Sequence, residues 1–105
     1  MSTWKLVERK IADRIDGTRV PVTGRQRGAT PDIDCEKLSP EVKHRKTLPA
    51  WIHDAMDQAQ ASKRGEQLPI VVLHGKNMHY DHSMVLVRLD DFIEWYGDPW
   101  RGSDD

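Results

Sequence analysis

The sequence of 105 residues predicts an α/β fold in which helices flank a central mixed sheet. Apolar side chains recur at helical spacing in residues 3–16 and 50–63. Short apolar runs of strand length occupy residues 68–73 and 84–87. Gly and Pro residues lie between these segments, as they do at turns. The predicted order is helix, three strands, helix, two strands and helix, in a single domain over residues 1–97.

The first helix is predicted to begin at Thr3, which can cap it, and to end before Gly17. One carboxylate, that of Glu8, falls inside the apolar stripe of this helix. Burying an unpaired carboxylate is costly. Glu8 therefore either reaches water from the edge of the stripe or has a cation or strong donors beside it. The stripe consists of Trp4, Val7, Ile11 and Ile15.

A strand over residues 18–22 is predicted next, followed by a basic loop with glycines over residues 23–30. Arg25 and Arg27 lie in this loop, directly before Pro31-Asp32. Most charged loops are simply solvated. The carboxylates that follow favour a second interpretation, in which both arginines contact phosphates.

Residues 32–36 and 41–44 flank a Lys-Leu-Ser-Pro turn, and this spacing predicts a β-hairpin. Because side chains alternate along a strand, one pairing register gathers the charged side chains on one face. Burial of the apolar face selects that register. The charged face would hold Asp32, Asp34, Glu41 and Lys43, and the apolar face Ile33, Cys35 and Val42.

The charged face of this hairpin has two interpretations. It is either a solvated edge whose charges keep the strand soluble, or a metal site. Carboxylates that converge within a few ångströms repel one another unless a cation lies among them, and hard oxygen ligands suit Mg²⁺ or Mn²⁺. Lys43 would then stabilise negative charge on a reacting phosphate, with Asp34 one pair further from the metal.

A second helix is predicted over residues 50–63, after Thr47-Leu48-Pro49 and before Gly65. Three basic residues precede it, His44, Arg45 and Lys46. Gln58 lies at the edge of its inward face. That face consists of Trp51, Ile52, Ala55, Met56 and Ala59.

The remaining elements are two strands and a helix. Residues 68–73 are predicted to form a central strand buried on both faces, and residues 84–87 another strand. A short amphipathic helix follows over residues 89–96, and residues 98–105 form a polar, flexible tail.

The loop between those strands contains His74, His79 and His82, which raises the question of a zinc site. Structural zinc takes four ligands, and the single cysteine, Cys35, belongs to the hairpin. Solvated histidines are the favoured interpretation, with a weak phosphate contact as an alternative.

Composition and charge narrow the function classes. No run is apolar enough for a signal peptide or a membrane span, and a lone cysteine excludes an intrachain disulfide, so we expect a cytoplasmic protein. The formal net charge of −1 conceals an asymmetry, because residues 1–64 carry 13 Lys and Arg against 9 Asp and Glu. A basic half is compatible with DNA binding. A hydrophobic content of 37% is low, and such small domains often complete their burial with a partner subunit.

Pro31-Asp32 followed, after eight residues, by Glu41-Val42-Lys43 resembles the motif of the PD-(D/E)XK nuclease superfamily. The acidic Glu8 on the first helix matches that family too. The resemblance covers about residues 4–96 and implies a restriction-endonuclease-like core and a nuclease domain over residues 1–97. Within the superfamily, the small size and the Val-Pro-Val-Thr-Gly segment before Pro31 look most like archaeal and phage-type Holliday junction resolvases.

The resemblance implies a metal-dependent DNA endonuclease that acts as a homodimer on four-way junctions, in a bacterial or phage-infected cell. It implies catalytic roles for Asp32, Glu41, Lys43, Glu8 and Gln58. One or two Mg²⁺ or Mn²⁺ ions would be held by Glu8, Asp32, Glu41 and the carbonyl of Val42. DNA contacts would come from Arg25, Arg27, Arg45, Lys46 and Thr23, with Thr30 as an alternative to Thr23. Two alternatives stay open: a nicking or repair endonuclease that needs no junction, and a DNA-binding protein of this fold that does not cut.

Overall fold

The structure is a computed structural model that describes residues 3–15, 18–19 and 33–96. It shows a small α/β protein with three α-helices and short antiparallel sheets. The chain divides into two compact units. We call residues 1–46 with 98–105 the N-terminal unit and residues 47–97 the C-terminal unit, and describe each by itself.

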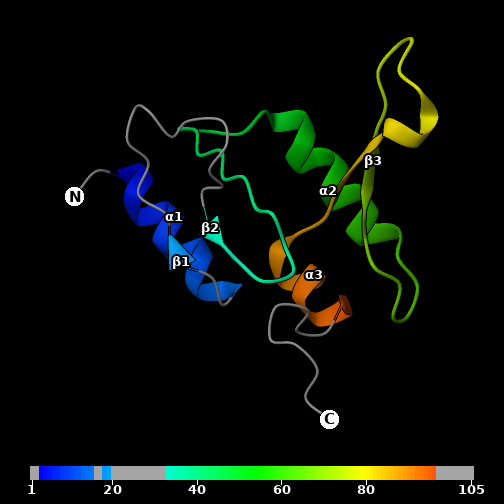
Figure 1. Ribbon diagram of the computed structural model, residues 1–105. Coiled ribbons are helices and arrows are strands. Elements are labelled where there is room, and N and C mark those ends of the chain that lie inside the picture. Colours follow the sequence, from blue (N-terminus) through cyan, green and yellow to red (C-terminus); the bar gives the residue numbers. More distant parts are fainter. Residues whose placement is uncertain (1–2, 16–17, 20–32, 97–105) are drawn as a thin grey trace. The chain divides into compact units, whose positions relative to one another are not determined.

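The N-terminal unit contains helix α1 (Thr3–Arg14) and two very short strands, β1 (Thr18–Arg19) and β2 (Ile33–Asp34). Figure 1 shows the two strands beside α1, and residues of α1 contact β1. The strands pair antiparallel, with Thr18 opposite Asp34 and Arg19 opposite Ile33. The helix predicted over residues 3–16 is confirmed, since α1 begins at Thr3 and ends at Arg14.

The core of this unit is small and well defined. Ile33 is completely buried, and Ala12 and Ile15 at the end of α1 are 2% and 3% exposed. The Cys35 thiol donates to the Ile15 carbonyl at 3.6 Å, which links the end of β2 to the end of α1. Strand β2 alternates as predicted, since Ile33 is buried and Asp34 is exposed.

The predicted hairpin between residues 32–36 and 41–44 is wrong. β2 pairs with β1, and residues 35–49 form no helix or strand. Pro40 has no N–H to donate to a ladder, and Val42 is the only apolar side chain from residue 41 to residue 46. A strand there would bury almost nothing. In the pairing with β1, Ile33 lies opposite Arg19 and is completely buried.

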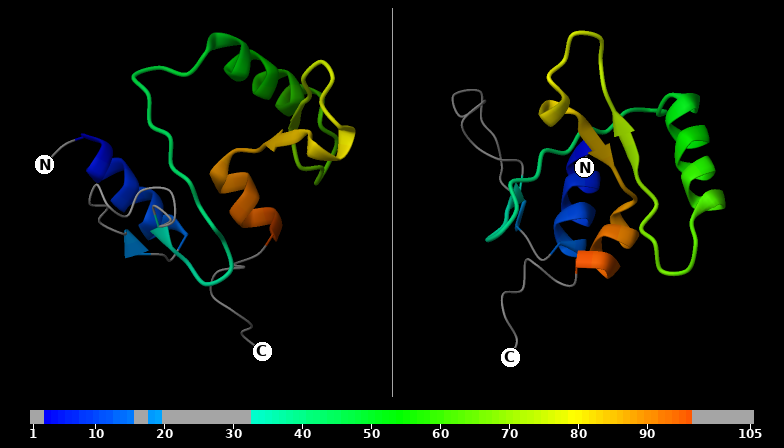
Figure 2. Two further views of the ribbon diagram at one scale, coloured as in Figure 1. Left: turned by 45° about the horizontal axis from the view of Figure 1, so that its top comes forward. Right: turned by 90° about the vertical axis from the view of Figure 1, so that its right-hand side faces the viewer.

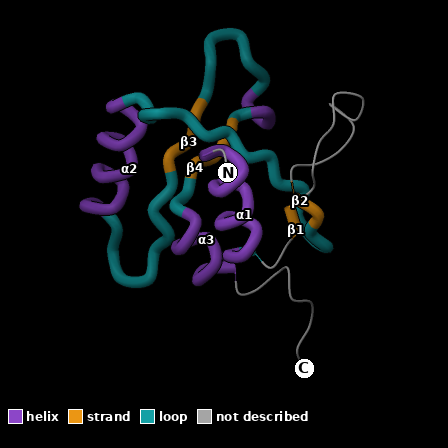
Figure 3. Tube along the Cα trace, turned by 90° about the vertical axis from the view of Figure 1, so that its left-hand side faces the viewer, coloured by secondary structure: helices purple, strands orange, loops and turns teal. Residues whose placement is uncertain are grey.

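The C-terminal unit contains α2 (Ala50–Ser62), β3 (Val71–Leu73), the single-turn 3-10 helix η2 (Tyr80–His82), β4 (Met84–Leu86) and α3 (Leu89–Tyr96). Strands β3 and β4 form an antiparallel hairpin in which Val72 lies opposite Val85. Figures 2 and 3 show α2 beside this hairpin, and α2 contacts β3. Both helices confirm their predicted positions.

The core of this unit centres on Met56 of α2, which is 6% exposed. Its predicted neighbours Ile52, Ala55 and Ala59 are half-buried. Trp51, predicted to face inward, is 56% exposed, so the inward face of α2 is narrower than its apolar residues suggested.

Two predictions about the sheet differ from the structure. Among the described residues the strands form two separate two-stranded antiparallel sheets, so these strands make no central mixed sheet. β3 is not buried on both faces either, because Val72 and its partner Val85 are 58% and 56% exposed. A two-stranded hairpin with a helix against one face leaves its other face uncovered. In the part of the chain that is described, no helix has the length and apolar character needed to cross a membrane.

Candidate functional site

Glu41 and Lys43 bring opposite charges together in the N-terminal unit. The Lys43 Nζ lies 3.2 Å from the Glu41 Oε2, and the two side chains are 68% and 60% exposed. An ion pair this accessible contributes little to stability, since water screens it. Either group can therefore leave its partner and bind a ligand instead. The pair presents an ammonium and a carboxylate at one point of the surface.

Glu8 lies on α1 and is half-buried, as its place in the apolar stripe predicts. It shares a helix face with Ile11 and Ile15, which are half-buried and buried. Trp4, one turn earlier on the same stripe, is 48% exposed. The apolar stripe is therefore more exposed toward the N-terminal end of α1. Glu8 lies between its exposed part and its buried part.

Basic side chains continue directly from Lys43. His44, Arg45 and Lys46 are all exposed, and the Arg45 guanidinium donates to the His44 carbonyl at 2.9 Å. We call Lys43, His44, Arg45 and Lys46 the basic segment. Four consecutive cationic or titratable side chains that point into water form the kind of surface that contacts a phosphate backbone.

Several predicted site residues cannot be placed with the pair. Thr23, Arg25, Arg27, Thr30 and Asp32 lie outside the described residues, although Asp32 directly precedes β2 in sequence. No group of three or more His, Cys, Asp or Glu side chains within residues 3–15, 18–19 and 33–96 is arranged to hold a metal ion. Val42 is half-buried between Glu41 and Lys43.

Gln58, the fifth predicted catalytic residue, belongs to the C-terminal unit. It is exposed on α2, and its backbone carbonyl accepts a hydrogen bond from the Ser62 hydroxyl at 3.0 Å. Glu8, Glu41 and Lys43 belong to the N-terminal unit.

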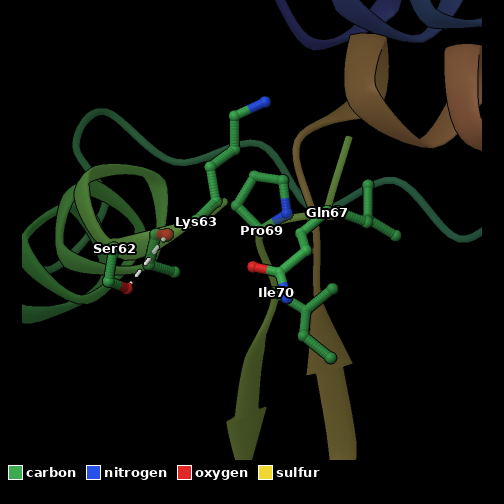
Figure 4. Close-up of a pocket in the computed structure, with 7 residues that line it drawn as sticks. Ser62, Lys63, Gln67, Pro69 and Ile70 are labelled. Carbon is green, nitrogen blue, oxygen red and sulfur yellow. Dashed lines mark hydrogen bonds between the residues drawn. The ribbon is translucent and has the colours of Figure 1, made fainter. Parts of the chain in front are cut away.

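An open hollow of about 380 Å³ lies in the C-terminal unit, where α2 ends and the chain turns toward β3. Figure 4 shows Pro69 between Lys63 and Ile70, with the Lys63 amino group pointing away from Ser62. The Ser62 hydroxyl is already bonded to the carbonyls of α2, and the Gln67 side-chain oxygen accepts from the Arg64 N–H at 2.8 Å. The hollow is shallow, and the Ser62 hydroxyl and the Gln67 side-chain oxygen already bond to the protein itself, so we assign it no catalytic role.

The loop between β3 and β4 carries two pairs of rings in contact. The rings of His74 and Tyr80 stack at 4.8 Å with an angle of 16° between their planes. The rings of His79 and His82 lie 5.2 Å apart, tilted by 40°. The sequence showed the His-x-x-His spacing, but the 3-10 turn that brings the two rings together was not predicted.

Comparison with protein-family models, with curated proteins and with solved structures gave no match to this chain.

Proposed function

We propose that this protein is a metal-dependent DNA endonuclease, acting on branched DNA as a Holliday junction resolvase. The observation that carries the proposal is the accessible Glu41–Lys43 pair, 3.2 Å apart, followed at once by the exposed basic segment. A carboxylate and an ammonium at one point, with phosphate-binding side chains next to them, are the groups that phosphodiester hydrolysis requires.

The proposal includes a Mg²⁺ or Mn²⁺ site made by Glu8, Asp32, Glu41 and the carbonyl of Val42. The donor set fits, because all four ligands are hard oxygen atoms and Glu41 is exposed enough to change its partner. When bound, the ion would supply a Lewis acid and lower the pKa of a coordinated water.

The other steps rest on side chains of this chain. Once Glu41 turns to a cation, the Lys43 ammonium loses its carboxylate and is available to the negative charge that develops on the phosphate. Arg45 and Lys46 would hold the DNA backbone beside it, and Arg25, Arg27 and Thr23 would extend this contact. The catalytic role of Gln58, which belongs to the C-terminal unit, stays a prediction. Symmetric cleavage of a junction needs two copies of the site, so the proposal includes a homodimer with a restriction-endonuclease-like core that contains β1, β2 and α1.

Cleavage of a labelled four-way junction and of a matched linear duplex, each with Mg²⁺, Mn²⁺ or EDTA, tests the proposal. Wild type is compared with Lys43→Ala and Glu41→Gln. Lys37→Ala is the matched control, because Lys37 is an exposed lysine of the same irregular segment. We expect metal-dependent, junction-selective cutting that both site variants lose by a factor of about 100 or more and the control retains, as for loss of one group that stabilises transition-state charge.

Other outcomes separate the alternatives. Equal cutting of junction and duplex would indicate a nicking or repair endonuclease. Junction binding without cutting by the wild type would refute the catalytic proposal and leave a structure-specific binding protein. The contact of the basic segment is checked separately. Lys46→Ala should weaken DNA binding equally for all sequences and reduce the slope of log K against log salt by about one.

A further inference from the structure

Two imidazole rings are held together at the tip of the β3–β4 hairpin, far along the sequence from the motif that suggested a nuclease. His79 caps η2 and His82 is its last residue. In a 3-10 helix, residues three apart lie on the same side because one turn takes three residues. This explains why the two rings are only 5.2 Å apart. Figure 2 shows the short turn within the loop of the hairpin.

The separation of the rings fits a shared metal ion. A Zn–N bond of about 2.1 Å places each ring centroid about 3.2 Å from the ion, so two imidazoles at a tetrahedral angle have centroids about 5.2 Å apart. The observed 5.2 Å agrees with this value. Two packed rings without a metal have similar distances, so the experiment below must separate these two cases.

Asp81 supplies a partner for the ring nitrogen that would face away from the ion. The Asp81 backbone N–H donates to the His79 Nδ1 at 3.2 Å, and the Asp81 Oδ2 lies 4.0 Å from the same nitrogen. Because Nδ1 accepts this bond, it carries no proton in this arrangement, and the proton of the neutral ring is on Nε2. A metal at Nε2 requires that proton on Nδ1, so binding would replace the bond from the Asp81 N–H by a bond from the His79 Nδ1–H to the Asp81 carboxylate. Such a carboxylate behind a histidine ligand fixes the tautomer and the ring orientation.

Besides the bond that the His79 ring accepts, backbone hydrogen bonds hold the turn in shape. The His82 N–H donates to the His79 carbonyl at 2.9 Å, and the Ser83 N–H donates to the Tyr80 carbonyl at 3.0 Å. On the other side of the loop, His74 stacks on Tyr80, and its Nε2 donates to the Met78 carbonyl at 2.9 Å. Because the backbone already has its turn, binding an ion costs little ordering of the chain.

We propose that His79 and His82 bind one late first-row divalent ion of the zinc class, with water in the remaining positions. Imidazole nitrogen suits Zn²⁺, Ni²⁺ and Cu²⁺ and not Mg²⁺, so this site is chemically distinct from the carboxylate site of the proposed nuclease and does not depend on it. Both rings are exposed, which leaves the ion open to a further ligand.

The test is calorimetric titration of the full chain with ZnCl₂ and, separately, NiCl₂ and MgCl₂. Wild type is compared with His82→Ala, His82→Gln and Asp81→Asn. His53→Ala is the matched control, because His53 is an exposed histidine of the same unit on α2. Circular dichroism checks that each variant is folded. His82 contributes its backbone N–H to the turn, and this bond remains in both His82 variants.

We expect one Zn²⁺ or Ni²⁺ to bind at the two histidines in the wild type and in the control, and any heat of Mg²⁺ binding to be the same in the wild type and in the His82 variants. Both His82 variants should bind at least tenfold more weakly, and Asp81→Asn about tenfold more weakly, as for a group behind a metal ligand. In NMR spectra, the ring resonances of His79 and His82 should shift together up to one equivalent. Equal zinc affinity in wild type and His82→Ala, or an equal loss in His53→Ala, would overturn the proposal and leave a plain ring contact.

Discussion

Replacing Ile33 by alanine should lower the free energy of unfolding of the N-terminal unit more than any substitution on its surface. Ile33 is completely buried, in β2 opposite Arg19 of β1. The substitution removes three carbon atoms, which at about 0.8 kcal/mol for each buried CH₂ amounts to about 2.4 kcal/mol. The cavity left behind adds to this loss, so we expect the free energy of unfolding to fall by about 3 kcal/mol.

The small size of this core should keep the loss of unfolding free energy large. Its other buried apolar side chains among the described residues are those of Ala12 and Ile15, so few neighbours can move in to fill the space. Ile33→Val should cost about 1 kcal/mol, which places the two variants in a graded series.

The assay is urea unfolding followed by NMR intensities of residues in each unit. Val72→Ala is the control, because Val72 is an apolar strand residue that is 58% exposed, and its loss should stay below about 0.5 kcal/mol. A loss below about 1 kcal/mol for Ile33→Ala would refute the reasoning, since it would mean that β2 does not anchor the unit.

Three other predictions concern the C-terminal unit. Met56→Ala should lower the free energy of unfolding by about 2 kcal/mol, measured by urea unfolding, because Met56 is 6% exposed. The Asp57 Oδ1 and the Arg88 Nη2 lie 2.9 Å apart. A double-mutant cycle on these two residues should give a coupling free energy of about 0.5 kcal/mol that decreases in 1 M salt. A larger coupling that does not depend on salt would contradict a solvent-screened pair. Gly65→Ala should lower the melting temperature by the equivalent of about 1 kcal/mol, because Gly65 has φ +53, where a side chain is strained. Gly75→Ala should not lower the melting temperature, since its added Cβ meets open space at a backbone angle that tolerates a side chain.

The local features of this fold could be predicted from the sequence, and the pairings could not. Three helices follow from apolar spacing and from the turn residues that bound them. The two strands of the C-terminal hairpin were found from short apolar runs, since Val71–Leu73 and Met84–Leu86 fall within the predicted segments. Each of these signals lies within a few residues.

Strand partners depend on distant parts of the chain. The segment from residue 32 could pair backward or forward along the sequence, and the spacing of the Lys-Leu-Ser-Pro turn favoured the wrong direction. In the structure β2 pairs backward with β1 and Ile33 is completely buried, and nothing near Ile33 in the sequence indicates that pairing. Trp51 was misplaced for a similar reason, because a helical stripe shows which side chains are apolar and not how wide the covering surface is.

The candidate site divides in the same way. Glu41 and Lys43 lie two residues apart, so their proximity needed only the local sequence. Glu8 was correctly placed within the apolar stripe, because helical periodicity fixes its direction. The rings of His79 and His82 were not predicted to meet, since a single 3-10 turn within a ten-residue loop leaves no periodic pattern.

Within the described residues β3 and β4 pair only with each other, and this predicts a pattern of isotope exchange. In a two-stranded antiparallel ladder every second amide of each strand points away from its partner. Transfer of the protein into D₂O should therefore label Val71–Leu73 and Met84–Leu86 in an alternating pattern, with neighbouring amides exchanging at very different rates. Residues in the interior of α2 carry intrahelical bonds on successive amides and should exchange without that alternation.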